Sequence, residues 1–323
     1  MENTFLVTGS DGHLGNTIVR MLLDRGKKVR GLRYSKSKLT TPIVEDCFYG
    51  DVTNLESMDK FFDAPNPIVI HTAGLISIDF RMTPVLSNTN INGTKNVIKQ
   101  CLKHKARLIY VSSVHAIQES KNTIFEPSEI DENKVLGSYA KTKAIATKMV
   151  RAVKKKIPIN IVYPSGILGP DDYGQNAINL AIKEFSQGKI NLYLKGGYAL
   201  VDVRDVAKAI VNLALSESKQ GKEYLLTGAY ASIKELLDMT ADLCNIKKVK
   251  FAIPIGLAKM VAPLSAIYYK LQKKPVLFSK YSLYTVSHKA IFSNEKAKME
   301  LNFYPRNLIE TVNDTLLFFR KKK

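Results

Sequence analysis

The sequence has few cysteines, no metal-ligand spacing and no long uninterrupted apolar run. Its three cysteines, Cys47, Cys101 and Cys244, lie far apart and form neither a metal-binding pattern nor a pairing pattern. We therefore expect reduced thiols, no bound metal and a cytoplasmic protein. The first residues already have the pattern of a strand, so no secretory signal is visible.

The most apolar stretch, residues 251–271, is broken by Pro254, Gly256, Lys259 and Pro263. A membrane-spanning helix needs about 20 largely uninterrupted apolar residues, so this stretch is not expected to cross a membrane. We favour a packed helix or the wall of a substrate pocket. A lid over an apolar substrate and a helix lying on a membrane surface remain the alternatives.

Acidic residues are scarce: 29 Asp and Glu face 48 Lys and Arg, which gives a net charge of +19. The lysines are scattered, and no basic stripe with interleaved aromatics or nucleic-acid motif is present. We expect a solvated lysine-rich surface and no nucleic-acid partner. An anionic membrane surface or a polyanionic substrate such as a coenzyme A ester are the alternatives. A homodimer is left open.

A strand, a glycine-rich turn and a helix are predicted at the N-terminus. Residues 5–8 are an apolar run, residues 18–23 have helical periodicity, and residues 8–15 between them read TGSDGHLG. Glycines at such a turn allow close approach of a pyrophosphate, which the helix N-terminus attracts. The alternative is a simple glycine turn. The predicted cofactor-binding residues here are Gly9, Asp11, Gly12, His13, Leu14 and Gly15.

The second predicted strand, residues 28–32, lacks the acidic residue that normally follows it in a dinucleotide site. Arg33 takes that place, with Ser35 and Lys36 just beyond. A guanidinium can donate hydrogen bonds to a 2′-phosphate, whereas a carboxylate would repel it. We therefore predict NADP(H), with NAD(H) possible. The alternative is that Arg33 is one more cation in a cation-rich chain.

Three further strands are predicted at residues 47–52, 67–74 and 107–113, separated by helical segments. Strands alternating with helices indicate an α/β fold with a Rossmann-type, doubly wound parallel sheet, in which ligands bind at the carboxyl ends of the strands. Those ends carry the next group of predicted site residues. They are Asp51, Val52, Thr72, Ala73, Gly74 and Ser113.

Tyr139 and Lys143 are four residues apart, so on a helix they lie on one face, one turn apart. A free phenol has a pKa of about 10 and is a poor acid or base at neutral pH. A nearby ammonium should lower that pKa and make Tyr139 usable as a general acid and base, with Ser113 hydrogen-bonding the same substrate oxygen. The alternative is a solvated lysine-rich helix face.

Together these motifs resemble the extended short-chain dehydrogenase/reductase family, also described as the NAD-dependent epimerase/dehydratase family, over nearly the whole chain. The resemblance rests on the turn at 8–15, on the Tyr139–Lys143 pair and on further segments in the expected order. These are Asp51-Val52, residues 71–74, Asn90 with Gly93-Thr94, Ser112-Ser113, residues 163–170 and residues 201–207. It implies that Tyr139 is the acid/base, that Lys143 holds the nicotinamide ribose and tunes Tyr139, and that Ser113 positions the substrate oxygen. It also implies that Asn90 supports Lys143 through water and that Tyr163, Pro164, Ser165 and Gly166 bind the cofactor.

The sequence departs from the sugar-nucleotide branches of this family, which narrows the resemblance to other branches. Val114 and His115 stand where nucleotide-sugar dehydratases carry Asp-Glu, and Tyr163 and Gly166 stand where epimerases carry Arg and Asn. Residues 163–166, 292–297 and 301–306 look like the branch of dihydroflavonol reductases, cinnamoyl-CoA reductases and 3β-hydroxysteroid dehydrogenases. His115 could contact the substrate or simply pack; His71 more plausibly shapes its turn than binds a metal.

We therefore predict an NADP(H)-dependent oxidoreductase that interconverts a carbonyl and a secondary alcohol on a small, bulky apolar substrate. A nucleotide-sugar epimerase with retained NAD is the alternative, and a non-catalytic NADP sensor is a third possibility. We expect one extended Rossmann domain over residues 1–323. Residues 1–165 would be mainly the dinucleotide-binding core and 166–323 mainly the substrate lobe, interleaved with the core around 190–230.

Overall fold

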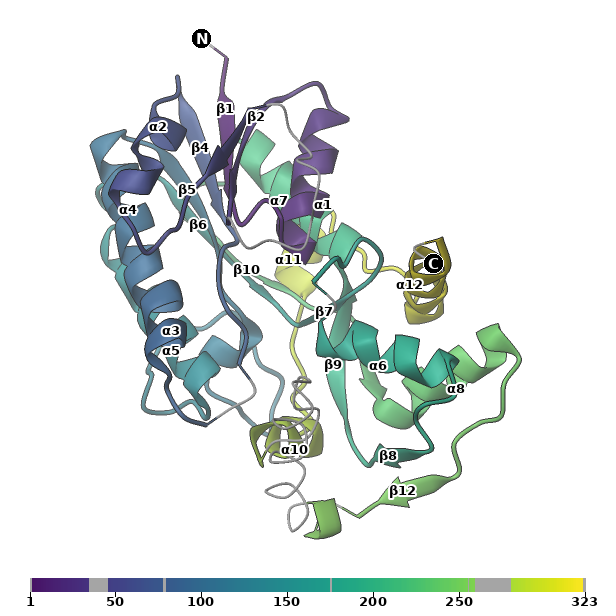
Figure 1. Cartoon of the computed structure of the whole chain (residues 1–323). Helices are drawn as coiled ribbons and strands as arrows, with labels where there is room; N and C mark the ends of the chain where they lie inside the picture. Colours follow the sequence, from purple (N-terminus) through teal and green to yellow (C-terminus); the bar gives the residue numbers. More distant parts are fainter. Residues whose placement is uncertain are drawn as a thin grey trace.

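The computed structural model describes residues 2–34, 46–77, 80–174, 176–254, 256–258 and 280–321. Its centre is a seven-stranded sheet in the order β10-β6-β5-β4-β1-β2-β3, in which all neighbouring strands pair in parallel (Figure 1). The strands are β1 (Thr4–Thr8), β2 (Lys28–Arg33), β3 (Cys47–Tyr49), β4 (Pro67–His71), β5 (Arg107–Val111), β6 (Ile159–Pro164) and β10 (Glu223–Leu226). The predicted Rossmann-type parallel sheet is confirmed.

Helices cover both faces of this sheet, which explains why β1, β4, β5 and β6 are buried along their whole length. Alternating side chains of each strand enter two separate hydrophobic clusters, so that Leu6 and Leu108 lie in one and Phe5 and Ile109 in the other. The first cluster is covered by α2 (Asp59–Phe62), α4 (Gly93–Lys103) and α5 (Ser138–Ala152), and the second by α1 (His13–Leu23), α7 (Val203–Leu215) and α11 (Glu295–Leu301).

Short helical turns connect these elements: η1 (Glu56–Met58), α3 (Pro84–Ser87), the π-helix η2 (Asn88–Asn92) and η3 (Val114–Ala116). Helix α1 begins earlier than its apolar periodicity indicated, at His13, directly after Gly12 of the glycine turn. The strands predicted at 5–8, 28–32, 47–52, 67–74 and 107–113 correspond to β1 to β5.

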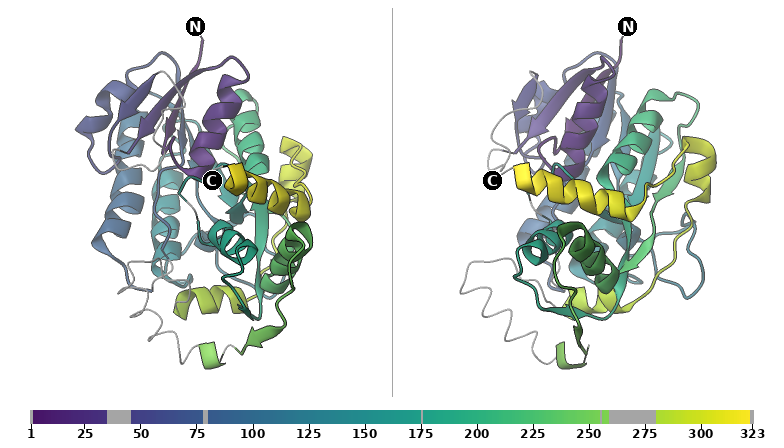
Figure 2. Two further views of the ribbon diagram at one scale, coloured as in Figure 1. Left: turned by 45° about the vertical axis from the view of Figure 1, so that its right-hand side comes forward. Right: turned by 90° about the vertical axis from the view of Figure 1, so that its right-hand side faces the viewer.

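A smaller lobe lies beside the carboxyl ends of the main strands (Figure 2). It contains a three-stranded sheet and a two-stranded sheet, with order β11-β9-β7 and β12-β8. Its strands are β7 (Gly166–Leu168), β8 (Leu192–Leu194), β9 (Gly197–Asp202), β11 (Tyr230–Ser232) and β12 (Phe251–Ile253). Its helices are α6 (Ala177–Ser186), α8 (Ile233–Cys244), α10 (Lys280–Ser287) and α12 (Leu308–Lys321).

The chain crosses between the two parts more than once. After β9 it returns to the main sheet as α7 and β10, goes back to the lobe as β11 and α8, and returns again as α11. Lobe and sheet are therefore built from interleaved segments. Across the described ranges, no helix has the length and apolar character needed to cross a membrane.

Candidate active site

The glycine turn is shaped by contacts that exclude larger residues. Gly9 has a φ of +69°, and a Cβ added there would lie 2.9 Å from the backbone nitrogen of Ala73. A Cβ added at Gly15 would lie 2.0 Å from the carbonyl oxygen of Gly9. The turn, the start of α1 and the loop after β4 can pack this closely because glycines occupy both positions.

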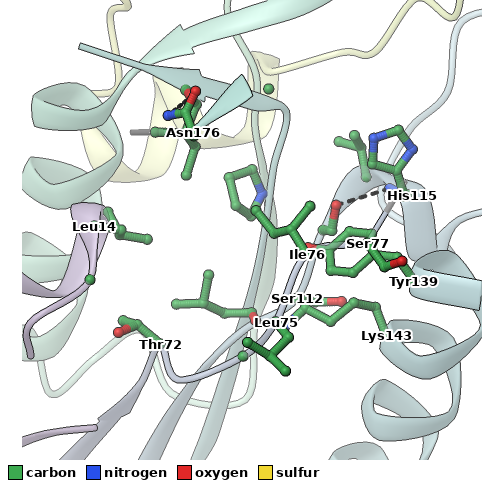
Figure 3. A pocket seen from close by; sticks show the side chains of 18 of the residues that line it. Leu14, Thr72, Leu75, Ile76, Ser77, Ser112, His115, Tyr139, Lys143 and Asn176 are labelled. Carbon is green, nitrogen blue, oxygen red and sulfur yellow. Dashed lines mark hydrogen bonds between the residues drawn. The ribbon is translucent and has the colours of Figure 1, made fainter. Parts of the chain in front are cut away.

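A cavity of about 1880 Å³ opens at the carboxyl ends of the main strands and is closed on its other side by the lobe. Figure 3 shows Leu14 and Thr72 at one side of it and Tyr139, Lys143 and His115 at the other, with Leu75 between them. Most of the predicted site residues line it. They are Gly9, Asp11, Gly12, His13, Leu14, Gly15, Asp51, Val52, Thr72, Ala73, Gly74, Ser113, Tyr139, Lys143, Pro164, Ser165 and Gly166.

The dinucleotide end of the cavity fits a nicotinamide dinucleotide. Among the described residues, no side chain caps the N-terminus of α1 at Gly12, so the first N–H groups of this helix are available to a pyrophosphate. His13 lines the cavity and its Nε2 lies 2.8 Å from the carbonyl oxygen of Pro170, which ties this turn to the lobe. Asp51 follows β3, and its Oδ1 accepts a hydrogen bond from the Thr53 N–H at 2.8 Å.

Arg33 ends β2 with its side chain buried, at 5 % exposure, and it is not among the residues that line the cavity. Its guanidinium lies over the ring of Tyr49, 5.8 Å from the centroid. Its Nε and Nη1 have no hydrogen-bond partner in the described part of the chain. Ser35 and Lys36 lie outside the described residues.

Tyr139 and Lys143 lie together at the wall opposite Leu14 and Thr72 (Figure 3), and Ser113 lines the same cavity. Ser113 follows β5, and its Oγ accepts a hydrogen bond from the His115 N–H at 3.2 Å and is hydrogen-bonded to Tyr139. Tyr139 and Lys143 lie one turn apart on α5. The Lys143 Nζ donates to the carbonyl oxygen of Val111 at 2.7 Å. The three side chains predicted as catalytic therefore share one site.

The protonation of this site differs from the prediction. Burial raises the pKa of Tyr139 to about 12, and its hydrogen bond with Ser113 opposes the rise only in part. Burial also lowers the pKa of Lys143 to about 7. The expected lowering of the tyrosine pKa by the ammonium is not found, because desolvation dominates and the Lys143 Nζ is directed to β5.

Two predicted cofactor residues have other partners. The Asn90 side chain accepts from the Leu75 N–H at 2.8 Å and donates to the Leu75 carbonyl oxygen at 2.9 Å and to Thr142 at 3.0 Å. It therefore clamps the loop after β4 onto α5. Tyr163 is fully buried and does not line the cavity; its hydroxyl donates to Glu223 at 2.5 Å. The alternation of β6 turns this side chain away from the cavity.

The segment after β6 forms the junction with the lobe. The Ser165 N–H donates to the Leu226 carbonyl oxygen at 3.2 Å, and the Ser165 Oγ is buried without a partner among the described residues. A Cβ added at Gly166 would meet the Leu200 side chain at 3.0 Å. The cavity wall passes here from the main sheet to β7 and β9.

Sequence reasoning missed the apolar wall of the substrate end. Leu75, Ile76, Val85 and Leu136 line the cavity, and each keeps 41 % or more of its side chain exposed. Two of them directly follow the loop at 72–74, a placement that could have identified them. The wall continues with residues of the lobe and of the C-terminal part. These include Ile178, Tyr198, Tyr284, Ala290 and Phe292.

Helix α10 is a further element that the sequence did not reveal. Its Tyr284 hydroxyl donates to Glu119 at 2.8 Å, and both residues line the cavity. Leu283 and Val286 anchor the helix in a small cluster with Leu194. This helix therefore links the lobe to the loop that follows Ser113.

Comparison with known proteins agrees with this geometry. Residues 5–226 match the model of the NAD dependent epimerase/dehydratase family. The chain is 26% identical to sterol demethylase protein B of Methylococcus capsulatus, over 99% of both chains. It is 30% identical to the mouse 3 beta-hydroxysteroid dehydrogenase type 7, over 51% of this chain and 50% of that protein. It is 28% identical to cinnamoyl-CoA reductase 1 of Oryza sativa subsp. japonica, over 73% and 75%.

Among solved structures, the UDP-glucose 4-epimerase of Thermotoga maritima with UDP-glucose superposes with a TM-score of 0.76. The identity is 20%, and the superposition covers 99% of both chains, so this likeness concerns the fold. The predicted resemblance is confirmed by the family match and by the reductase and dehydrogenase relatives.

Proposed function

The chain belongs to the NAD dependent epimerase/dehydratase family, whose members matched here include NAD(P)-dependent oxidoreductases, and we propose that it is an NADP(H)-dependent reductase or dehydrogenase. Its substrate is a bulky apolar molecule in which a carbonyl and a secondary alcohol are interconverted. The observation that carries this proposal is the grouping of Ser113, Tyr139 and Lys143 in one cavity with an apolar wall.

The protonation state of Tyr139 suits carbonyl reduction. Burial raises its pKa to about 12, so the phenol keeps its proton at neutral pH and can serve as the donor to a substrate oxygen. The same shift makes it a weaker acid, so the transfer depends on negative charge developing on that oxygen. Ser113, already hydrogen-bonded to Tyr139, orients the same oxygen. When bound, a nicotinamide dinucleotide supplies the hydride.

Lys143 acts beside this pair. Its Nζ is held by the Val111 carbonyl oxygen, and it faces the position of Gly74, where an added Cβ would lie 3.8 Å from Nζ. The absence of a side chain at Gly74 leaves room for a ribose next to the ammonium. Lys143 would hold the hydroxyls of that ribose.

The preference for NADP(H) rests on Arg33. Two nitrogens of its guanidinium, Nε and Nη1, are buried at the end of β2 without a partner in the described part of the chain, so a 2′-phosphate that reached them would satisfy their N–H groups. Its stacking on Tyr49 would hold it in place.

The substrate class rests on the wall formed by Leu75, Ile76, Val85 and Leu136. Exposed apolar side chains around a catalytic group favour an apolar ligand, because their burial on binding releases about 25 cal/mol for each Å² covered. The similarity to sterol demethylase protein B and to 3 beta-hydroxysteroid dehydrogenase type 7 favours a steroid-like skeleton.

We also propose a cytoplasmic location, consistent with free cysteines such as the fully buried Cys101.

A panel of carbonyls and alcohols, followed by NADPH absorbance, tests the function. It should contain steroid ketones, flavonoid-like ketones and acyl thioesters, together with UDP-sugars assayed for epimerisation. We expect turnover of an apolar carbonyl and faster turnover with NADPH than with NADH. Epimerised UDP-sugar, with NAD retained through purification, would instead establish the epimerase alternative.

A further inference from the structure

The side chain of Lys143 is held by two groups of one strand, β5. Its Nζ donates to the Val111 carbonyl oxygen at 2.7 Å and to the Tyr110 hydroxyl at 3.4 Å. The Tyr110 ring also lies beneath the ammonium, with 4.9 Å between Nζ and the ring centroid. An ammonium has three N–H donors, so β5 occupies two of them and one is left for the cavity.

Tyr110 is suited to accept this hydrogen bond. It is 1 % exposed; burial raises the pKa of its hydroxyl, and the nearby Thr94 and Thr147 side chains oppose that rise. Thr94 donates its own proton to the Asn90 carbonyl oxygen and Thr147 donates to the Lys143 carbonyl oxygen, each at 2.7 Å. Both threonine protons are thus used elsewhere, and the oxygen lone pairs of Tyr110 remain to accept from the Lys143 ammonium.

No other described side chain supplies this support. The Asn90 amide is used by Leu75 and Thr142. The titratable groups around Lys143 are Tyr110 on β5, His71 on β4 and Tyr139 on α5, with His115 packed against Tyr139. His71 is neutral, because burial and the nearby Lys143 lower its pKa to about 3. No carboxylate contributes to the pKa of Lys143 in the described part of the chain.

We propose that Tyr110 is a positioning residue of the active site: its hydroxyl fixes the Lys143 ammonium and favours its charged form, so that the remaining N–H points to the ribose and to Tyr139. The proposal rests on the role proposed for Lys143. It assigns to a buried strand tyrosine a support for Lys143 that the family resemblance implied for Asn90, acting through water.

The direct test is the titration of Lys143 in wild type and in Tyr110→Phe, followed by NMR of labelled lysine side chains. The Lys143 signal is assigned from its absence in Lys143→Gln. Removing one acceptor from a buried ammonium disfavours the charged form, so we expect the Lys143 midpoint to fall by about 0.5 to 1 pH unit.

Tyr163→Phe is the matched control. Like Tyr110, Tyr163 is buried in the cluster beneath α5, and it lies on β6, next to β5. Its hydroxyl donates to Glu223 and has no contact with Lys143 among the described hydrogen bonds. We expect this variant to lose stability while its Lys143 midpoint stays at the wild-type value. A Tyr110→Phe midpoint equal to that of wild type, or a shift matched by Tyr163→Phe, would overturn the proposal.

A second variant covers the case in which Tyr110→Phe does not fold. Thr94→Val combined with Thr147→Val keeps Tyr110 but removes the polar groups beside its hydroxyl that orient it, and should give a smaller shift in the same direction; no shift in that variant overturns the proposal.

NADPH titration by fluorescence separates this proposal from the proposed function. In wild type, affinity should fall as the pH rises through the midpoint of Lys143, and Tyr110→Phe should weaken binding about 3- to 10-fold at neutral pH. A wild-type protein that does not bind NADPH would contradict the function but leave the lysine titration as an independent result.

Discussion

Tyr139 and Lys143 show how burial sets the chemistry of individual residues. Their spacing placed them on one helix face, and that part of the prediction follows from helix geometry. The pKa of Tyr139 rises and the pKa of Lys143 falls. Both shifts favour the neutral form, because burial removes the two side chains from solvent. A spacing in the sequence cannot supply this, because desolvation depends on β5 and on the loops that close over the pair.

Tyr163 gives the converse lesson. Its position in a family motif suggested cofactor binding, yet a motif does not state which face of the strand a side chain occupies. In β6 the side chain of Tyr163 lies in the cluster beneath α5, whereas Pro164, Ser165 and Gly166 line the cavity. Adjacent strand residues point to opposite faces, so one motif serves both the core and the site.

Replacing Arg33 should change cofactor preference. In Arg33→Gln we expect NADPH affinity to fall about 10- to 100-fold, because a charge-assisted contact to the 2′-phosphate is lost, while NADH affinity changes less than about 2-fold. Fluorescence titration with both cofactors measures this.

Arg30→Gln serves as the control on the same strand, since Arg30 pairs with Asp46 at 2.7 Å. It should leave the NADPH to NADH ratio unchanged. Equal weakening of both cofactors by Arg33→Gln would remove the basis for the NADP assignment.

At the scale of elements, the contact between the glycine turn and α1 is predictable from sequence. In Gly15→Ala the new methyl group would overlap the Gly9 carbonyl oxygen, so the turn and helix must separate. We expect a loss of about 2 kcal/mol in the free energy of unfolding and a large loss of NADPH binding. Thermal unfolding and cofactor titration measure the two effects.

Gly256→Ala is a suitable comparison, because a Cβ at Gly256 meets no atom of the described residues within 4 Å. It should change stability by less than about 0.5 kcal/mol. If Gly15→Ala binds NADPH as tightly as Gly256→Ala does, the turn does not hold the pyrophosphate.

An ion cluster joins β10 to α5. Arg151 binds Glu223 at 2.6 Å, and Lys154 and Tyr163 also donate to this carboxylate. Burial alone would raise the pKa of Glu223, but these donors outweigh it and hold the pKa below its usual value. The pairing of β10 with β6 could not be predicted from local patterns, because Glu223 meets residues more than fifty positions earlier.

Glu223→Gln should therefore reduce the free energy of unfolding by about 2 to 3 kcal/mol at neutral pH. A carboxyl group whose pKa is lower in the folded state stabilises the fold at pH values above its unfolded-state pKa of about 4.3. This contribution disappears as the pH falls through the folded-state pKa. The difference between wild type and variant should shrink below about pH 4 in denaturant titrations.

Glu295→Gln is the matched control, because it removes an exposed carboxylate. The Glu295 side chain is 64% exposed, and its Oε1 lies 2.7 Å from the Lys298 Nζ. Its effect should stay below about 0.5 kcal/mol at every pH. A Glu223→Gln difference that is constant with pH would show that the carboxylate charge does not stabilise the fold.

At the scale of the whole molecule, the site exists because two interleaved parts meet. The glycine turn, the Tyr139–Lys143 spacing and the existence of the first five strands followed from local patterns. The order of the strands in the sheet did not, and the apolar wall is assembled from loops and from α10. The structure describes only part of the apolar stretch 251–271, namely Phe251–Ile253 in β12, Pro254 and residues 256–258. The rest of the stretch, for which a packed helix or pocket wall was predicted, lies outside the described residues. The formal net charge of the sequence is +19, and the solvated lysine-rich surface inferred from it stays a prediction.

The central claim is that Tyr139 donates the proton in an NADPH-linked reduction of an apolar carbonyl. The most direct measurement compares kcat and the NADPH dissociation constant of wild type, Tyr139→Phe and Tyr304→Phe, the last at a tyrosine 67% exposed. We predict that Tyr139→Phe loses about 100-fold or more in kcat, with NADPH binding unchanged, and that Tyr304→Phe matches wild type. A Tyr139→Phe enzyme that retains most of its rate would contradict the account.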